Sequence, residues 1–270
     1  GGAELPFLTQ PPAGPLAEAR ALLMGLGALD DRGHVTAHGR ALAGLPLHPR
    51  LAHMLALAGP EAAELAALLA ERDPLRGAGP DLTLRMQAIR RPGPEADRGV
   101  VERIRAEAKR LASSAQKGDK PGLTLAEMAA LAYPDRIGLR RKGEAPRWVL
   151  SGGKGAAMAA GLSLSGARLI VATDLDGDAR EAAVRQAVAI SEAEVRGLYS
   201  DRIRWVEVCE WSRREGRVLA RRQERLGALV LDDRHWDAPP EVVAKAALEG
   251  LRGLGLPWSP AARRLRARAR

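Results

Sequence analysis

Residues 151–155, S-G-G-K-G, have the types that can contact a phosphate, because glycine N–H groups stand beside Lys154. Their spacing is not that of a P-loop, G-x-x-x-x-G-K-[ST], and the sequence holds no acidic Walker-B or D-E-x-H box. The chain therefore lacks the residues that cradle ATP and hold Mg²⁺. Two interpretations of the segment remain: a hairpin turn between strands, or a phosphate contact within a nucleic-acid groove.

The acidic run Asp174, Asp176 and Asp178 is only partly similar to a calcium loop. Gly177 precedes the third carboxylate instead of following it, and Arg185 stands where a bidentate glutamate is needed. We therefore predict a turn here and no bound metal.

The remaining candidate ligands are four histidines, and no cysteine or carboxylate cluster accompanies them. Among them only His34 and His38 have an i, i+4 spacing. We predict packing or surface roles for these two, His48 and His53. Cys209 shares strand parity with neighbouring tryptophans, so we expect an apolar role for it. The sequence predicts no catalytic residue.

The elements that position these residues begin with a polar turn at residues 30–33. Thr36 follows as the N-cap of a short helix, and Gly44 and Pro46 end that helix. Together with an amphipathic helix over residues 16–26, this pattern predicts a partial winged helix over residues 1–47, after an irregular lead-in at residues 1–15.

Helical periodicity continues over residues 48–132, with Pro74 ending one helix, Asp81 capping another, and Thr124 and Glu127 forming a capping box. At Tyr133 the period changes to that of strands. Five are expected, at residues 136–141, 147–151, 156–162, 168–173 and 183–190. Five short strands predict an OB-like β-barrel over residues 133–200.

The last 70 or so residues combine both patterns. Strands are expected at residues 203–211, 217–222 and 228–231, and helices from Pro239-Pro240 and from Ser259-Pro260. The last helix lacks a C-cap signal, which indicates a truncated α+β module over residues 201–270. The predicted fold class is thus multidomain α+β: a helical portion, an OB-like barrel and a small C-terminal module.

Charge and cysteine content limit the functional classes. There are 42 Lys and Arg against 33 Asp and Glu, a formal charge of +9. This excess suits a polyanion partner, or else reflects an arginine-rich genome composition. We predict a cytoplasmic chain without membrane contact, for three reasons. The chain has a single cysteine, it lacks a signal peptide, and no apolar run approaches the ~20 residues that span a bilayer.

Four motifs carry a resemblance to a known family: T-x-x-G-R-x-L-A-x-L-P-L-H-P-R-L-A from Thr36, E-R-D-P-L from Glu71, A-Y-P-D-R-I from Ala132 and P-W-S-P-A-A-R from Pro257. In this order they resemble the C-terminal part of bacterial HrpB-type DEAH-box ATP-dependent helicases. The resemblance implies a winged-helix remnant, a helical ratchet domain over residues 48–132, and the OB-like and C-terminal domains. ATP and Mg²⁺ are then expected only in motor domains outside this chain, which by itself should be inactive and bind no cofactor.

The resemblance also implies that the ratchet domain lies along a bound strand, which makes its arginines candidate phosphate contacts: Arg72, Arg76, Arg85, Arg90 and Arg91. The basic end of the first barrel strand and the glycine-rich turn add further candidates: Arg136, Arg140, Arg141, Lys142 and Lys154. Tyr133 and Trp148 are the only barrel-region aromatics for base stacking, so we expect backbone contacts to dominate. The expected partners are single-stranded RNA or DNA and the motor domains of the same polypeptide. The alternative is a protein-docking module without intrinsic nucleic-acid affinity.

Overall fold

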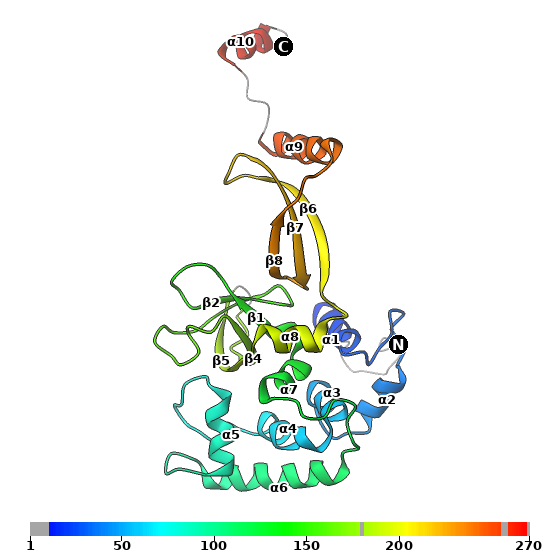
Figure 1. Cartoon of the computed structure of the whole chain (residues 1–270), viewed down its shortest axis with the longest axis vertical. Helices are drawn as coiled ribbons and strands as arrows, with labels where there is room; N and C mark the ends of the chain where they lie inside the picture. The colour runs from blue at the N-terminus through cyan, green and yellow to red at the C-terminus, as the bar shows by residue number, and fades with distance from the viewer. Residues whose placement is uncertain (1–10, 179–180, 255–258, 269–270) are drawn as a thin grey trace. The chain divides into compact units, whose positions relative to one another are not determined.

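The computed structural model describes residues 11–178, 181–254 and 259–268, and it divides the chain into two compact units, residues 1–200 and 201–270 (Figure 1). The first ten residues of the expected lead-in, Pro257 and Trp258 of the fourth motif, and the last two residues of the chain lie outside the described residues. The predicted α+β class is confirmed.

The first unit begins with helices whose caps are local in sequence. Thr36 accepts a hydrogen bond from the Gly39 N–H (2.9 Å) to start a short helix, and Thr124 and Glu127 form the predicted capping box. A bridge between Leu29 and Val35 closes the polar turn before the first of these. The helical elements are α1 (Ala13–Gly25), α2 (Ala37–Ala43), α3 (Pro49–Ala58), η2 (Gly59–Ala62), α4 (Ala63–Ala70), α5 (Leu82–Arg90), α6 (Arg98–Ser114), α7 (Leu125–Ala132) and η3 (Pro134–Arg136).

The apolar stripes of these helices meet in one core. Helix α4 packs against α6, and α3 packs against α7, so that Met54, Leu65 and Ile104 are completely buried. Figure 1 shows α6 running beneath α4, with α5 standing across one end of α6, on the side of this unit away from the barrel. Burial of each such leucine, isoleucine or methionine side chain contributes roughly 1.5–3 kcal/mol to stability. This packing holds the helices in place relative to one another, and with them the basic residues at their ends.

A closed five-stranded barrel follows, with strand order β1-β2-β3-β5-β4 and β1 pairing with β4. All pairs are antiparallel except β3 with β5. Trp148 and Ile170 fill the interior, where a Cβ on Gly138 would lie only 3.1 Å from Trp148 Cβ. The strands are β1 (Ile137–Arg140), β2 (Arg147–Leu150), β3 (Gly155–Ala157), β4 (Leu169–Leu175) and β5 (Glu181–Ala189).

The five predicted strands are present, and the third is shorter than expected. It ends at Ala157, because residues 160–166 form turns instead of continuing the pairing. Helix α8 (Glu192–Tyr199) then returns the chain to the helical core: its capping-box residue Glu194 accepts a hydrogen bond from Thr124 (2.7 Å), and the Tyr199 hydroxyl donates to the Ala130 carbonyl (2.8 Å). Barrel and helices therefore share one packed unit.

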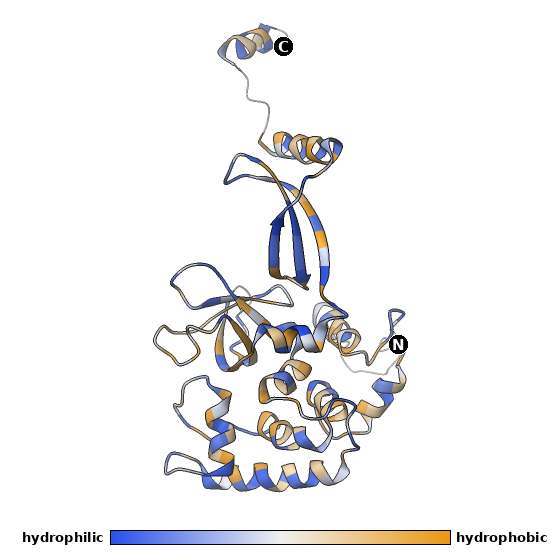
Figure 2. Cartoon of the chain, viewed as in Figure 1, coloured by the Kyte–Doolittle hydropathy of each residue, from blue (hydrophilic) through white to orange (hydrophobic). Residues whose placement is uncertain are grey.

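The second unit is a three-stranded antiparallel sheet, in order β6-β7-β8, with a helix packed on it. Its elements are β6 (Arg204–Ser212), β7 (Arg217–Leu226), β8 (Leu229–His235), α9 (Pro240–Leu254) and α10 (Pro260–Arg268). Gly250 of α9 lies directly on the Trp211 ring, and Cys209 is half-buried beside α9 with its Sγ 3.8 Å from the Val242 carbonyl oxygen. Figure 2 shows that β7 and β8 are hydrophilic along most of their length, whereas β6 alternates.

Within the described ranges, no helix combines the length and the apolar character required to cross a lipid bilayer.

Candidate nucleic-acid interface

The predicted cations of the helical region differ in whether a carboxylate already neutralises them. Arg72 pairs with Glu71 at 3.8 Å and Arg90 with Glu64 at 2.9 Å, although both arginine side chains remain about two-thirds exposed. Arg76 and Arg91 are also exposed, and neither has an ion pair with any described residue. These last two are therefore the helical-region candidates whose charge is fully available to a phosphate.

Arg85 does not fit the predicted set of phosphate contacts. Its side chain is only 2% exposed, and its guanidinium donates two hydrogen bonds to Asp73 Oδ2, at 3.1 and 2.7 Å. Further donors reach the carbonyls of Ala78, Gly79 and Asp81. Arg85 thus holds the loop before α5 and has no surface left for a phosphate.

Of the predicted barrel cations, Arg136 lies half-buried in η3 before β1, and the other four lie at opposite ends of β2. Arg141 and Lys142 are exposed on the loop that leads from β1 into β2, whereas Lys154 ends the turn that leads from β2 into β3. None of these three side chains is in an ion pair with a described residue. Arg140 lies at the first of these ends, half-buried, and donates to the Glu144 carbonyl at 3.1 Å. One strand-end cluster is therefore Arg140, Arg141 and Lys142, and Lys154 belongs elsewhere.

The glycine-rich turn at residues 151–155 is a hairpin turn, as the first of its two interpretations stated. The N–H groups of Ser151, Gly152 and Gly153 donate to the carbonyls of Ile137, Asp135 and Leu150, each at 2.8 Å. These amides therefore cannot cradle a phosphate, and only the Lys154 side chain remains available.

The aromatics considered for base stacking are both buried. Trp148 is 0% exposed and donates from Nε1 to the Ala167 carbonyl at 3.1 Å. Tyr133 is 9% exposed, and the guanidinium groups of Arg50 and Arg136 each lie 5.1 Å from its ring centroid. Neither ring offers a face to a passing base.

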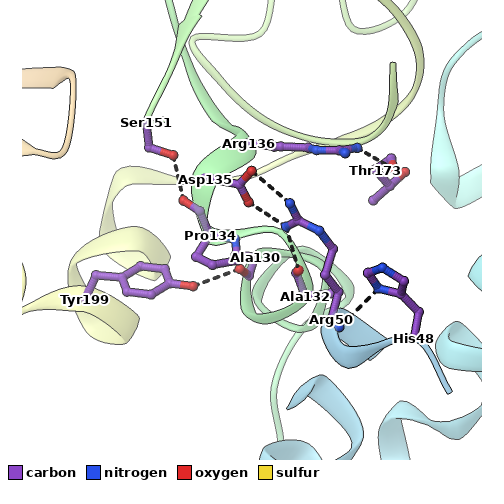
Figure 3. Close-up of polar contacts among 10 residues, drawn as sticks. All are labelled: His48, Arg50, Ala130, Ala132, Pro134, Asp135, Arg136, Ser151, Thr173 and Tyr199. Atoms are coloured by element: carbon purple, nitrogen blue, oxygen red, sulfur yellow. Dashed lines mark hydrogen bonds and ion pairs between the residues drawn. The ribbon is translucent and has the colours of Figure 1, made fainter. Parts of the chain in front are cut away.

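Arg50 is the centre of a network that sequence reasoning missed (Figure 3). Its guanidinium forms a bidentate pair with Asp135, at 2.5 and 2.9 Å, and also donates to the Ala132 carbonyl at 3.2 Å. Its backbone N–H donates to His48 Nδ1 at 3.3 Å. The network joins the start of α3 to the turn that enters the barrel, and both segments belong to the motifs L-P-L-H-P-R and A-Y-P-D-R-I.

Burial and the charges of Arg50 and Arg136 set the pKa values of the groups in this network. Burial raises the pKa of the Asp135 carboxyl, but the Arg50 hydrogen bonds and charge outweigh it, so the pKa lies below its ordinary value. Burial, with Arg50 and then Arg136 nearby, lowers the pKa of His48. Burial also lowers the pKa of Arg136, whose Nη1 donates to the Thr173 carbonyl at 3.3 Å. Asp135 is therefore ionised and His48 neutral near pH 7.

The other candidate sites are structural. Asp176 closes the acidic turn by accepting hydrogen bonds from the N–H groups of Asp178 and Ala183, at 3.1 and 2.9 Å. The closest histidine pair is His38 with His53, whose ring nitrogens are 2.8 Å apart, instead of His34 with His38. No group of three or more metal-binding side chains occurs within the described part of the chain.

Comparison with known proteins relates this fold to a helicase. Residues 202–236, which hold β6 to β8, match the family model described as "ATP-dependent RNA helicase HrpB, connector region". The chain is 29% identical over 277 residues to the ATP-dependent RNA helicase HrpB of Escherichia coli (strain K12), an overlap of 98% of this chain and 33% of the relative. The chain thus spans about a third of the length of that relative.

Two crystal structures of E. coli HrpB are also similar. The one described as a DExH-box NTPase has a TM-score of 0.71 at 30% identity, and the one described as a DEAH/RHA helicase has a TM-score of 0.69 at 26% identity. Each match covers 98% of this chain and 33% of the other. The predicted resemblance to the C-terminal part of HrpB-type helicases is confirmed.

Proposed function

We propose that this chain, which is similar over 98% of its length to a third of the E. coli helicase HrpB, binds a single nucleic-acid strand and couples that strand to helicase motor domains. The observation that carries the proposal is the strand-end cluster of Arg140, Arg141 and Lys142. Arg141 and Lys142 are exposed and unpaired among the described residues, at one end of a closed barrel. Unpaired cations of this kind attract phosphate by releasing condensed counterions.

The barrel topology supports an OB assignment for residues 133–200. A five-stranded Greek-key barrel with one parallel closure is the architecture that OB domains use to bind oligonucleotides and oligosaccharides. We also assign residues 1–47 to a winged-helix remnant and residues 48–132 to a ratchet domain, as the resemblance implies. Arg76 and Arg91 in the ratchet domain are then a second contact point for the strand backbone.

The chemistry of the whole helicase is assigned to its motor domains. ATP and Mg²⁺ would bind there, and this chain would supply contacts to the strand and to those domains. Because backbone contacts carry no base information, we propose little sequence preference for the strand. A cytoplasmic location is part of the same proposal.

Anisotropy of a labelled oligonucleotide of about 12 nucleotides, RNA or DNA, tests strand binding at several salt concentrations. The variant Arg141→Gln/Lys142→Gln should bind more weakly, and its plot of log K against log salt should be shallower by about 1.4, since each lost phosphate contact on a single strand removes ~0.7. Arg76→Gln/Arg91→Gln should show a similar change.

A matched control removes the same charge elsewhere. Arg110→Gln/Arg217→Gln deletes two arginines that pair with Glu107 and Glu215, both far from the candidate residues in sequence. The control should keep the salt slope of the parent. Equal losses in all three variants would mean that only net charge matters, and would refute the assigned surface.

The second candidate function is a protein-docking module, which one observation favours. Helix α9 leaves Leu248, Leu251 and Leu254 exposed at 48%, 39% and 59%. Exposed leucines on one helix suit an apolar protein contact better than a polyanion. Salt-insensitive association with the separately expressed motor domains, without oligonucleotide binding, would support docking over strand binding.

A further inference from the structure

A cavity of about 610 Å³ opens beside the Arg50 network, within the first unit. Its wall is formed by α1, the segment that leads into α3, the end of α4 and the turn that enters the barrel. Small-molecule sites commonly measure about 300–1,000 Å³ and combine an apolar wall with a few converging polar groups. The volume therefore suits a ligand the size of one nucleotide.

The polar side of the cavity presents hydrogen-bond donors. His48 is neutral and accepts at Nδ1 from the Arg50 N–H, so its proton is on Nε2, which becomes a donor. Arg136 uses one N–H for the Thr173 carbonyl, and no carboxylate of the described residues lies within ion-pair distance of its guanidinium. Both residues line the cavity, and Figure 3 shows their side chains within the Arg50 network.

The acidic residue closest to these donors is already occupied. Asp135 binds Arg50 through both carboxylate oxygens, so the Arg50 and Asp135 charges compensate each other. Asp135 and Asp174 attract the Arg136 guanidinium electrostatically, but neither forms an ion pair with it, so its N–H groups remain for a ligand. These donors favour an anion, and Arg matches the geometry of a phosphate well.

Apolar side chains also line the cavity. Leu22, Leu47 and Leu69 contribute them, from three different segments of the chain. An inorganic anion would leave these leucines without a partner, whereas a nucleobase would cover them. The polar and apolar lining residues together match the two chemical halves of a nucleotide.

We propose that this cavity binds one nucleoside phosphate, with the phosphate against Arg136 and His48 and the base against the leucines. If the nucleotide belongs to a bound strand, the cavity is a pocket for one unstacked nucleotide of that strand, and the proposal then rests on the proposed function. It extends beyond that function where the ligand is a free nucleotide.

Equilibrium dialysis with AMP and with UMP at low salt is the direct test. The parent chain should bind them saturably, and inorganic phosphate should bind more weakly. Ala70→Trp, at an exposed cavity-lining position, adds bulk without removing charge and should weaken AMP binding at least tenfold. Arg136→Gln should also weaken AMP binding at least tenfold, because it removes the phosphate partner. Far-UV circular dichroism shows whether each variant folds, and Arg136→Gln replaces Ala70→Trp as the test if Ala70→Trp does not fold.

Arg141→Gln/Lys142→Gln is the control, because neither residue lines the cavity. It should bind AMP like the parent while binding oligonucleotides more weakly. Competition then identifies the source: excess AMP displaces a labelled oligonucleotide if a strand nucleotide occupies the cavity, and does not if the ligand is free nucleotide.

The two proposals fail separately. No saturable AMP or UMP binding by the parent, or AMP binding that is unchanged in both cavity variants, would overturn the cavity proposal even if oligonucleotides bind. AMP binding without oligonucleotide binding would instead overturn strand binding and leave the cavity proposal standing.

Discussion

The ion pair between Arg50 and Asp135 yields the most sharply defined stability prediction. Asp135→Asn keeps the shape of the side chain but leaves the Arg50 charge, whose side chain is 10% exposed, without its counter-charge. Removing one partner of a buried pair costs about 3–5 kcal/mol. Because the Asp135 side chain is 43% exposed, water compensates part of this, and we expect about 2–3 kcal/mol.

Urea unfolding followed by far-UV circular dichroism measures this cost. With a slope near 2 kcal/mol per molar, the midpoint should fall by roughly 1 M. Hydrogen exchange should place the loss in α3 and η3, which the pair connects. The double variant Arg50→Met/Asp135→Asn should lose less than the sum of the two single variants, because it leaves neither an uncompensated guanidinium nor an uncompensated carboxylate.

The pH dependence gives the same pair a second signature. The folded pKa of Asp135 is lower than its ordinary value of 3.8, so the unfolded chain takes up the proton first as the pH falls. The stabilisation is complete above the unfolded pKa and is lost as the pH falls through the folded pKa. Parent and Asp135→Asn should therefore differ at about pH 7, and the difference should shrink as the pH falls below 3.8 and through the folded pKa. A difference that stays constant over this range would refute this account of the pair.

Two further predictions concern single positions. Arg85→Met leaves Asp73, whose side chain is 40% exposed, without its partner, so it should cost about 1–3 kcal/mol in urea unfolding, less than the removal of a fully buried partner. Oligonucleotide affinity of the folded fraction should stay unchanged; weaker affinity of a fully folded variant would show that Arg85 contacts the strand. Gly250→Ala should cost about 1–3 kcal/mol, because the new Cβ would overlap the Trp211 ring. Near-UV circular dichroism should report the displaced indole, and an unchanged spectrum and stability would contradict the α9 packing.

Features encoded over a few residues were predictable from the sequence. The capping box at Thr124 forms as expected, and a second one forms at Ser191, since each needs only a side chain and an amide three residues apart. Strand positions followed from alternation and from glycine turns. The third strand came out shorter than expected, because where pairing stops depends on the neighbouring strand and not on the segment itself.

The candidate site was harder to predict, because burial of an arginine depends on distant partners. A signal did exist for Arg85: it lies at helical spacing within the apolar stripe of Leu82, Met86 and Ile89, where a charge requires a partner. No local signal marks Arg50 and Asp135 as a pair. They are 85 positions apart, and only the packing of α3 beneath the barrel entrance brings them together.

Net charge proved a poor guide to the interface, for a related reason. The chain has a formal charge of +9, yet Arg72, Arg90, Arg103 and Arg110 each lie beside a carboxylate. Such surface pairs contribute at most about 1 kcal/mol to stability, but they cancel charge that a polyanion would otherwise meet. A nucleic-acid partner would therefore be bound by the few predicted cations that have no pair within the described residues, chiefly Arg141 and Lys142. An arginine excess from genome composition explains the paired ones equally well, so only the unpaired ones distinguish a strand-binding surface from an ordinary solvated one.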